Sequence, residues 1–476
     1  MYSIVFPVPS GDSGHQKSSS VLLLLLTFTL SISHSGCVRA APLQKFSLER
    51  ALSTALENNR LKSISQKSVQ IAEQQYQQAV SAQWPSLSLN ASFQRRDQGP
   101  TFEYPAQSFN LNLNSPVPPI EVPAQELPLL GRDTALYSLQ AMYPIYTGGK
   151  LSSVIKQARL GKDIATTEAR RTDLQIVQDV KRYYYASIYT AQLRNLAEEI
   201  SISFKVLADI TETFYLGGSN SVNKLDFLQS KLALSLAQST HADLKAKHQS
   251  ALAALSFSMG LPWQDNIQIT QHYYPQDLTP DNLESLIQQA QKFNPELHKL
   301  TLAVDAYQAK IDEEKSANYP TLAMFASVDA FNNDLDGGLS NDSNNHSWTV
   351  GIGMQVELLN GGMTRRKIAA ANIKLSQVHD QRFLMNEAVA AQVKNLFLAI
   401  NAVQQQLAIT ESAVQISHDN LDLSKRAYQT GAVKTEKVIE ANLSDALIRA
   451  KHYRALHDQA LHLAETAYLL GKETVQ

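Results

Sequence analysis

Cysteine is almost absent from this 476-residue chain, because Cys37 is the only one. The sequence therefore has no disulfide framework and no set of cysteines spaced to bind a metal. The formal net charge is −2, so no excess of basic residues indicates a nucleic-acid partner. Apart from Val21–Leu30, no apolar run approaches the ~18 residues that a membrane-spanning helix needs.

Catalytic signatures are missing as well. The sequence contains no His-Glu-x-x-His motif, no nucleophile elbow and no dinucleotide fingerprint. Three histidines of the last predicted helix are spaced by five residues: His452, His457 and His462. Five residues turn a helix by a net ~140°, so the three side chains share no face. Carboxylate pairs such as Glu313-Glu314 lie in polar helical sequence. We therefore predict no enzyme activity, no cofactor and no metal site.

The N-terminus has the features of an export signal. The apolar run follows Lys17, and Val38-Arg39-Ala40 fits a small-x-small cleavage site, so we predict a signal peptide over 1–40. Lipidation of Cys37 is the less favoured alternative, because the usual leucine three residues before the cysteine is missing. If cleavage follows Ala40, the mature chain has no thiol, and its stability must come from packing or assembly.

The chain contains a tandem duplication. Residues 48–87 align without a gap with 283–322 at a spacing of 235, and from the Gly-Gly pairs onward a second gapless register has a spacing of 213. The difference, 235 − 213 = 22, falls between the two predicted strands of each half. We expect repeats over 41–262 and 281–472, a linker over 263–280 and a tail over 473–476.

Each half is predicted to begin with one amphipathic helix, over 47–83 and 281–318. Pro85 and Pro320 are expected to end these helices. A strand, a loop and a second strand follow in each half. The loops are predicted to be irregular and exposed, since 98–133 holds seven of the 17 prolines and 332–346 is rich in Asn, Asp and Gly.

The strand at 347–358 alternates strictly between apolar residues and small or polar ones. Such a strand suits a sheet sandwich, and it equally suits a membrane barrel whose apolar side meets lipid and whose polar side lines a lumen. Tyr137, Tyr143 and Trp348 lie near strand ends, where an interfacial aromatic girdle would place them. The pattern of 320–331 leaves open which of its faces is apolar.

Very long helices are predicted after both glycine pairs. Residues 150–215 contain no proline and a single glycine, and 363–428 contain neither, so each can form a rod about 100 Å long. Two Tyr-x-x-Gly motifs then end the rods and begin helices returning over 222–259 and 434–470, where Leu225, Leu228, Leu232 and Leu236 mark an apolar stripe. The positions of the motifs are Gly148, Gly149, Gly361 and Gly362 for the strand-to-helix turns, and Tyr215, Gly218, Tyr428 and Gly431 for the hairpin tips.

Four strands cannot close a barrel, and open edges in lipid leave costly unpaired backbone groups. If the strands are in a membrane, several copies of the chain must therefore contribute their strands to one closed barrel. A dimer would give eight strands with a filled interior, whereas a trimer would give twelve with room for a channel, which the small residues of the polar face favour.

The duplicated half, the Trp/Tyr-Pro-Ser/Thr-Leu junction, the strand–Gly-Gly–long helix order and the Tyr-x-x-Gly tips together resemble the TolC family of outer-membrane efflux and secretion ducts. The resemblance covers essentially the whole mature chain. It implies a homotrimer with a twelve-stranded barrel in the outer membrane of a Gram-negative bacterium and a twelve-helix periplasmic tube. It also implies a periplasmic adaptor (membrane fusion) protein that docks at the tips, and an inner-membrane RND, ABC or MFS transporter that supplies the cargo.

The resemblance further implies acidic residues six and nine positions past the second tip glycine, ringing a closed aperture. Glu440 matches, whereas Lys437 departs, as does Lys224 in the first half. A salt-bridged latch is then expected rather than a purely cation-attracting ring, and Glu436 and Asp226 lie near enough to restore some acidity. A plain solvated helix face is the alternative interpretation of these charges.

Two rivals remain open from sequence. Within transport, the duct could serve type I protein secretion rather than efflux of drugs and other small molecules. From another class, an exported coiled-coil stalk or filament would explain the long helices, but it would not explain four amphipathic strands in matching places of two repeats.

Overall fold

The computed structural model describes residues 44–110, 118–218, 222–263, 265–270, 274, 282–333 and 345–472. The predicted signal peptide with Cys37, the tail and most of the linker lie outside the described residues.

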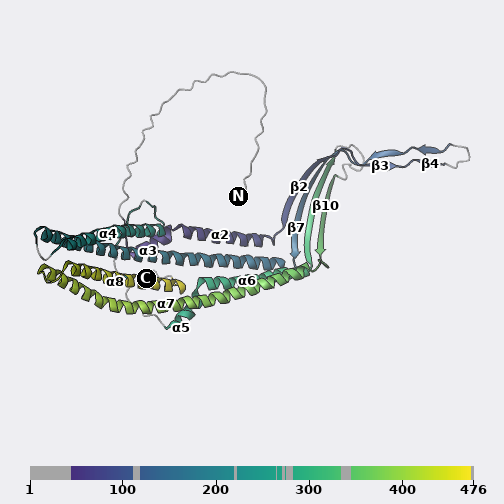
Figure 1. The fold of residues 1–476 in the computed structure, drawn as a ribbon. Coiled ribbons are helices and arrows are strands. Elements are labelled where there is room, and N and C mark those ends of the chain that lie inside the picture. Colours follow the sequence, from purple (N-terminus) through teal and green to yellow (C-terminus); the bar gives the residue numbers. More distant parts are fainter. Residues whose placement is uncertain are drawn as a thin grey trace, which may run out of the picture. The chain divides into compact units, whose positions relative to one another are not determined.

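Among the described residues both halves have the same order of elements, except that the first half has four additional short strands and the second an additional short turn. The first half contains β1 (Gln44–Phe46), α1 (Leu48–Asn58), α2 (Arg60–Ser81), β2 (Ser86–Arg95), β3 (Thr101–Tyr104), β4 (Gln107–Phe109), β5 (Ile120–Val122), β6 (Gln125–Pro128), β7 (Asp133–Tyr146), α3 (Lys150–Leu216) and α4 (Lys224–Ser258). The second half contains β8 (Ile267–Ile269), α5 (Leu283–Phe293), α6 (Pro295–Lys315) with the short turn η1 (Ser316–Asn318), β9 (Thr321–Asn333), β10 (His346–Gln355), α7 (Met363–Gln429) and α8 (Thr435–Leu469). The long helices lie alongside one another, and the strands continue from one end of them (Figure 1).

The prediction of one continuous opening helix in each half is wrong. Asn59 and Asn294 take extended backbone angles and separate α1 from α2 and α5 from α6. Each asparagine caps the helix that follows, the Asn59 side chain accepting from Leu61 N at 2.9 Å. Its amide also donates to the Ser258 carbonyl at the end of α4, at 2.7 Å. The break is thus fixed by a contact with a helix end almost two hundred positions away in the chain.

The break brings α1 close to the end of α4. Gly260 has φ +72°, and a Cβ there would lie 2.6 Å from the Asn58 carbonyl oxygen, so only glycine fits without a shift. The adjoining core contains Phe46, Leu52, Tyr184, Leu255 and Met259. We call this region, where Asn59 meets the end of α4, the Asn59 joint. Its counterpart in the second half is Asn294, whose amide donates to the Leu469 carbonyl at 3.4 Å.

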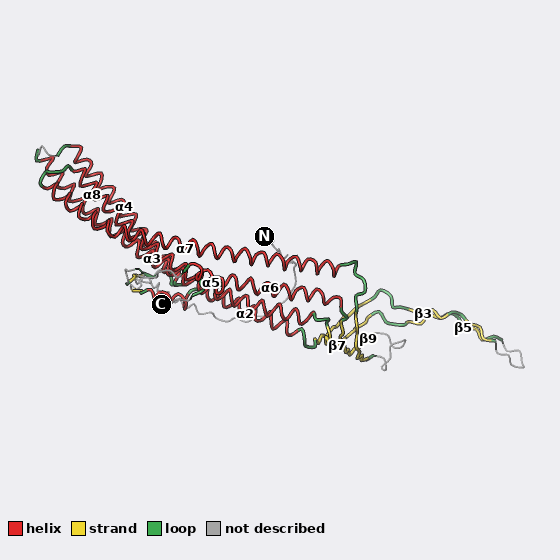
Figure 2. The backbone as a smooth tube through the Cα atoms, turned by 90° about the horizontal axis from the view of Figure 1, so that it is seen from below, coloured by secondary structure: helices red, strands yellow, loops and turns green. Residues whose placement is uncertain are grey.

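The helices form a layer in which α3 is central. Towards the strands α3 packs between α2 and α6, with α7 beyond α6; towards the tips it packs between α4 and α8, with α7 beyond α8 (Figure 2). None of the helices among the described residues is long and apolar enough to cross a membrane.

Four long strands form one antiparallel sheet in the order β10-β9-β7-β2. Directly paired residues lie on the same face of a sheet, so the register decides which face each side chain occupies. It joins apolar residues of all four strands in successive rows: Leu89, Leu139, Val328 and Trp348 in one, and Leu87, Ala141, Ala326 and Val350 in the next. The apolar face of β9, which the sequence left open, is therefore the one that carries Leu322, Met324, Ala326 and Val328.

The described part of the loop at 98–133, which excludes 111–117, is not irregular, contrary to the sequence prediction. It continues the β2–β7 pair as a two-stranded ribbon, in which β3 pairs with β6 and β4 with β5 (Figure 1). Both pairs share one register, interrupted where Pro105 and Pro123 cannot donate to the ladder. A proline-rich segment is compatible with a ribbon here because the strands between the prolines are only three or four residues long. Residues 334–344, in the second loop, lie outside the described residues.

Candidate functional site

The strand-to-helix turns are built by glycines with positive φ. Gly148 and Gly149 have φ of +63° and +88° before α3, and Gly361 and Gly362 have +64° and +81° before α7. These backbone angles are costly for any residue with a Cβ, which accounts for the repeated Gly-Gly pair.

The two prolines singled out from the sequence lie at helix-to-strand junctions, as predicted. Pro85 immediately precedes β2 and follows the end of α2 at Ser81 by four residues. Pro320 immediately precedes β9 and follows the end of η1 at Asn318 by two residues. The fixed φ of proline suits the extended entry into each strand.

The second hairpin tip ends α7 with a close turn. Gly431 has φ +75°, and the Ala432 amide donates to the Ala427 carbonyl at 2.9 Å, which satisfies a carbonyl of the last helical turn. Beneath the turn Tyr428 is buried. Its hydroxyl lies 3.1 Å from Thr211 Oγ1 of α3 and accepts from Thr435 Oγ1 of α8 at 3.3 Å. A buried tyrosine therefore joins three helices at this tip.

The first tip is arranged differently although its motif is the same. Gly218 has φ +71°, but Tyr215 stacks on Phe227 of α4, with ring centroids 5.5 Å apart and planes 7° from parallel. Residues 219–221 of this tip lie outside the described residues. The two Tyr-x-x-Gly motifs thus share a backbone role while their aromatic rings have different partners.

The charged residues near the tips fall into two groups. Lys437 Nζ and Glu440 Oε2 form an exposed ion pair at 2.7 Å on α8, and the hydrogen bond that Lys437 donates to the Glu440 carboxylate raises the pKa of Lys437. Asp226 instead belongs to a capping box, in which its carboxylate accepts from the Asn223 amide at 3.0 Å. Lys224 and Glu436 are exposed in the first turns of α4 and α8. A helix cap thus already engages one of the two acidic groups that were expected to add charge at the aperture.

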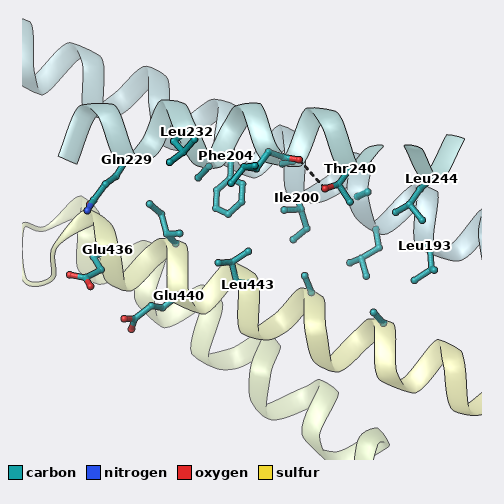
Figure 3. Close-up of a pocket in the computed structure, with 18 residues that line it drawn as sticks. Leu193, Ile200, Phe204, Gln229, Leu232, Thr240, Leu244, Glu436, Glu440 and Leu443 are labelled. Atoms are coloured by element: carbon teal, nitrogen blue, oxygen red, sulfur yellow. Dashed lines mark hydrogen bonds between the residues drawn. The ribbon is translucent and has the colours of Figure 1, made fainter. Parts of the chain in front are cut away.

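A groove of about 510 Å³ runs beside these residues, between α4, α3 and α8. Leu232 of α4, Phe204 and Ile200 of α3 and Leu443 of α8 line its apolar length (Figure 3). Glu436 and Glu440 lie at the end nearest the tips, with their carboxylates turned away from the leucines (Figure 3). The leucine stripe predicted on α4 is therefore not covered within one chain, and Leu225 and Leu236 remain about three-fifths exposed.

A polar seam on α8, whose partners lie on α3 and α7, was missed at the sequence level. Asn442 is fully buried and accepts from Ser203 Oγ at 2.7 Å, while Asp445 is 1% exposed and accepts from Ser417 Oγ at 3.1 Å. Arg449 links Asp445 to Glu199 of α3, at 3.6 and 2.7 Å. The signal was present, since these side chains continue the three-to-four-residue spacing of the buried face that begins at Val438.

The histidines of α8 occupy separate environments. His452 Nδ1 lies 3.0 Å from Thr410 Oγ1, whereas the His457 ring stacks on Tyr189 at 4.8 Å. Burial lowers the pKa of His457. No group of three or more potential metal ligands occurs among the described residues.

Comparison with known proteins gives one family. The sequence matches the family described as "Outer membrane efflux protein" over residues 131–261 and 286–472. It is 22% identical over 346 residues to the cation efflux system protein CusC of Escherichia coli K12, covering 68% of this chain and 71% of CusC. It is 23% identical over 192 residues to the outer membrane protein TolC of the same strain, covering 37% of this chain and 39% of TolC.

The fold is shared with solved channels. The crystal structure of the CmeC outer membrane channel of Campylobacter jejuni superposes with a TM-score of 0.74 at 13% identity, covering 89% of this chain and 85% of CmeC. At this identity the likeness concerns the fold, and it confirms the predicted combination of strands with long helices in a tandem repeat.

Proposed function

Because this chain belongs to the outer membrane efflux protein family, we propose that three copies form a channel through the outer membrane of a Gram-negative bacterium. The four long strands of each copy contribute to one twelve-stranded barrel. The long helices α3, α4, α7 and α8 form a tube in the periplasm, with the hairpin tips at the far end from the membrane.

The sheet is the observation that supports this most. Its apolar rows extend across all four strands, and the side chains are exposed in the single chain, with Leu89 at 70% and Trp348 at 76%. No helix among the described residues packs on the sheet with more than weak contact. In water such a face would be a large uncovered apolar patch, whereas in lipid it is the outer wall of a barrel.

The two edges of the sheet support pooling between copies. β2 and β10 each pair on one side only. In lipid, the unpaired backbone groups of an edge cost several kcal/mol each, so joining β2 of one copy to β10 of the next removes that cost.

Uncovered helix faces are consistent with the same arrangement. α2 and α4 lie at one edge of the helical layer and α7 at the other. Ile409, Ile416 and Leu423 of α7 are spaced by seven residues and are exposed, as is the leucine stripe of α4. A seven-residue apolar repeat is the seam of a coiled coil, so α7 of one copy can pack on α4 of the next.

The transport route we propose enters at the tips. An inner-membrane transporter of the RND, ABC or MFS type passes substrate to the tube through a periplasmic adaptor that docks near Tyr215, Gly218, Tyr428 and Gly431. The buried hydrogen bond between Tyr428 and Thr211 must break when the aperture widens. The cargo is either small molecules or a secreted protein, because the same tube can serve both.

At the aperture, three copies would bring three Lys437–Glu440 pairs together. Each pair is already neutralised within its own helix, which supports a salt-bridged latch over a purely acidic ring. We predict that Glu440→Gln frees Lys437 and lowers the cation-to-anion permeability ratio of single channels. Lys437→Gln is the matched control, since it frees the carboxylate and should raise the ratio. Equal ratios in wild type and both variants would contradict the role of this pair.

The proposal as a whole is tested by purifying the mature chain in detergent. A trimer by light scattering that inserts discrete pores into a planar bilayer is expected. An exported stalk would instead leave the outer-membrane fraction in a mild wash and make no pores. A water-soluble monomer without conductance would overturn the proposal.

Co-purification from detergent should then identify the adaptor and the transporter. Recovery with a multidrug pump favours efflux, whereas recovery with a peptide or protein exporter favours secretion.

A further inference from the structure

On the face opposite the apolar rows, two successive rows near the middle of the sheet are polar, and the rows on either side of them carry Leu136 with Phe331 and Met142 with Phe325. The register joins Asn90, Ser138, Asp329 and Ser347 in one row, and Ser88, Gln140, Ser327 and Thr349 in the next. Arg95 and Asp133 pair with each other at the strand ends, in the rows of the apolar face. Within the described strands of this sheet, Asp329 is therefore the only Asp, Glu, Lys or Arg on the polar face.

Asp329 is held in a fixed place. Ser138 of β7 donates to its Oδ1 at 2.5 Å, and Ser327 of β9 donates to its Oδ2 at 2.8 Å. Gln140 in turn donates to Ser138 Oγ at 3.1 Å. The carboxylate is half-buried among hydroxyls that act as donors, which favour an ionised acceptor, and no Lys or Arg of the described strands forms an ion pair with it.

The position of Asp329 along β9 shows how far this carboxylate lies from the helices. β9 begins at Thr321, beside the helices, and ends at Asn333, so Asp329 lies in the half of the sheet remote from the helical tube. The acidic and basic residues at the tips are at the opposite end of the long helices. Asp329 is thus a charged position in the sheet, separate from the charged residues at the hairpin tips.

We propose that Asp329 from each copy forms a ring of carboxylates on the lumen wall near the outer mouth, which favours passage of cations and cationic solutes. This inference rests on the proposed trimeric barrel, in which the polar face lines the lumen. A carboxylate about 10 Å from a permeating ion in water raises the local concentration of a monovalent cation about 1.5- to 2-fold at ~0.01 M salt. At ~1 M salt, where the screening length is about 3 Å, the effect disappears.

The test is the reversal potential of purified channels in a potassium chloride gradient. Asp329→Asn keeps an oxygen acceptor for Ser138 but removes the charge. Because a carboxylate enriches potassium and depletes chloride by the same factor, its removal should lower the potassium-to-chloride permeability ratio by at least about 2- to 4-fold at ~0.01 M salt and leave it unchanged at ~1 M. Asp329→Glu should retain the wild-type ratio. Asp133→Asn is the matched control, because it removes a carboxylate from the other face of the sheet and should not change the ratio.

The variants are made both in the wild-type protein and in Glu440→Gln, so that the effect of the Glu440 charge on selectivity does not hide the effect of Asp329. If Asp329 only joins β9 to β7 through its hydrogen bond with Ser138, Asp329→Asn will conduct with wild-type selectivity at every salt concentration, and the inference is overturned. If wild-type protein forms no pores at all, the proposed function itself fails, which is a distinct result.

Discussion

The Asn59 joint makes a quantitative prediction, because one side chain caps two helix ends at once. Replacing Asn59 by alanine removes the cap on the Leu61 amide, worth about 1 kcal/mol, and the hydrogen bond to the Ser258 carbonyl, worth about another 1 kcal/mol. The sum of about 2 kcal/mol corresponds to about thirtyfold in the local opening equilibrium. Asn59→Ser keeps a capping oxygen but cannot reach Ser258, so about half of the loss, or about fivefold, is expected.

Hydrogen exchange measured by mass spectrometry is the suitable assay, since it reports local opening without requiring the whole assembly to unfold. Exchange should accelerate in peptides covering the start of α2 and the end of α4 and remain unchanged in α7. Asn58→Ala is the control, because Asn58 is exposed and only its backbone faces Gly260. If Asn59→Ala and Asn58→Ala exchange alike, the side chain of Asn59 does not hold the joint and the reasoning is refuted.

Two further predictions concern stability: one compares glycines at equivalent positions of the repeat, and the other concerns the pH dependence of one ion pair. A Cβ at Gly148 would lie 2.7 Å from the Ser316 carbonyl oxygen, whereas within the chain Gly361 has nothing within 4 Å, although both have positive φ. Gly148→Ala should therefore destabilise by about 1–3 kcal/mol more than Gly361→Ala in thermal melts of detergent-solubilised protein, and equal melting temperatures would contradict this. The hydrogen bond from Arg171, helped by Lys299, lowers the pKa of Glu168 to about 2. Because that folded-state pKa lies below the unfolded value, the stabilising contribution is full above pH 4.5 and is lost as the pH falls towards 2. The melting-temperature difference between wild type and Glu168→Gln should accordingly be largest near neutral pH and shrink below pH 4.5, and a difference independent of pH would argue against this ion pair.

Much of the fold follows from local sequence signals. Long segments without proline and with at most one glycine predict α3 and α7, and a period of two predicts the long strands, because both depend on residues close together in the chain. The Gly-Gly and Tyr-x-x-Gly motifs correctly mark the helix boundaries, since positive φ is a local requirement that glycine meets best. The duplication reinforces these signals by presenting each of them twice.

The candidate site could be predicted only in part. Lys437 and Glu440 were singled out through the family resemblance, and their spacing of three along a helix is consistent with the ion pair that they form. The buried seam of Asn442 and Asp445 was overlooked, because its hydrogen-bond partners Ser203 and Ser417 lie on other helices and no local pattern joins them. The ribbon at 98–133 was mistaken for a loop, since its short strands are separated by prolines and carry no long alternating run.

Sequence patterns by themselves therefore determined the long helices, the long strands, their order and their repetition, because these depend on interactions between near neighbours. Tertiary structure decided where the opening helices break, which face of β9 is apolar, and that Asp329 shares a row with Ser138. Each of these depends on partners about two hundred positions away in the chain, and no local pattern specifies the register in which such distant segments meet.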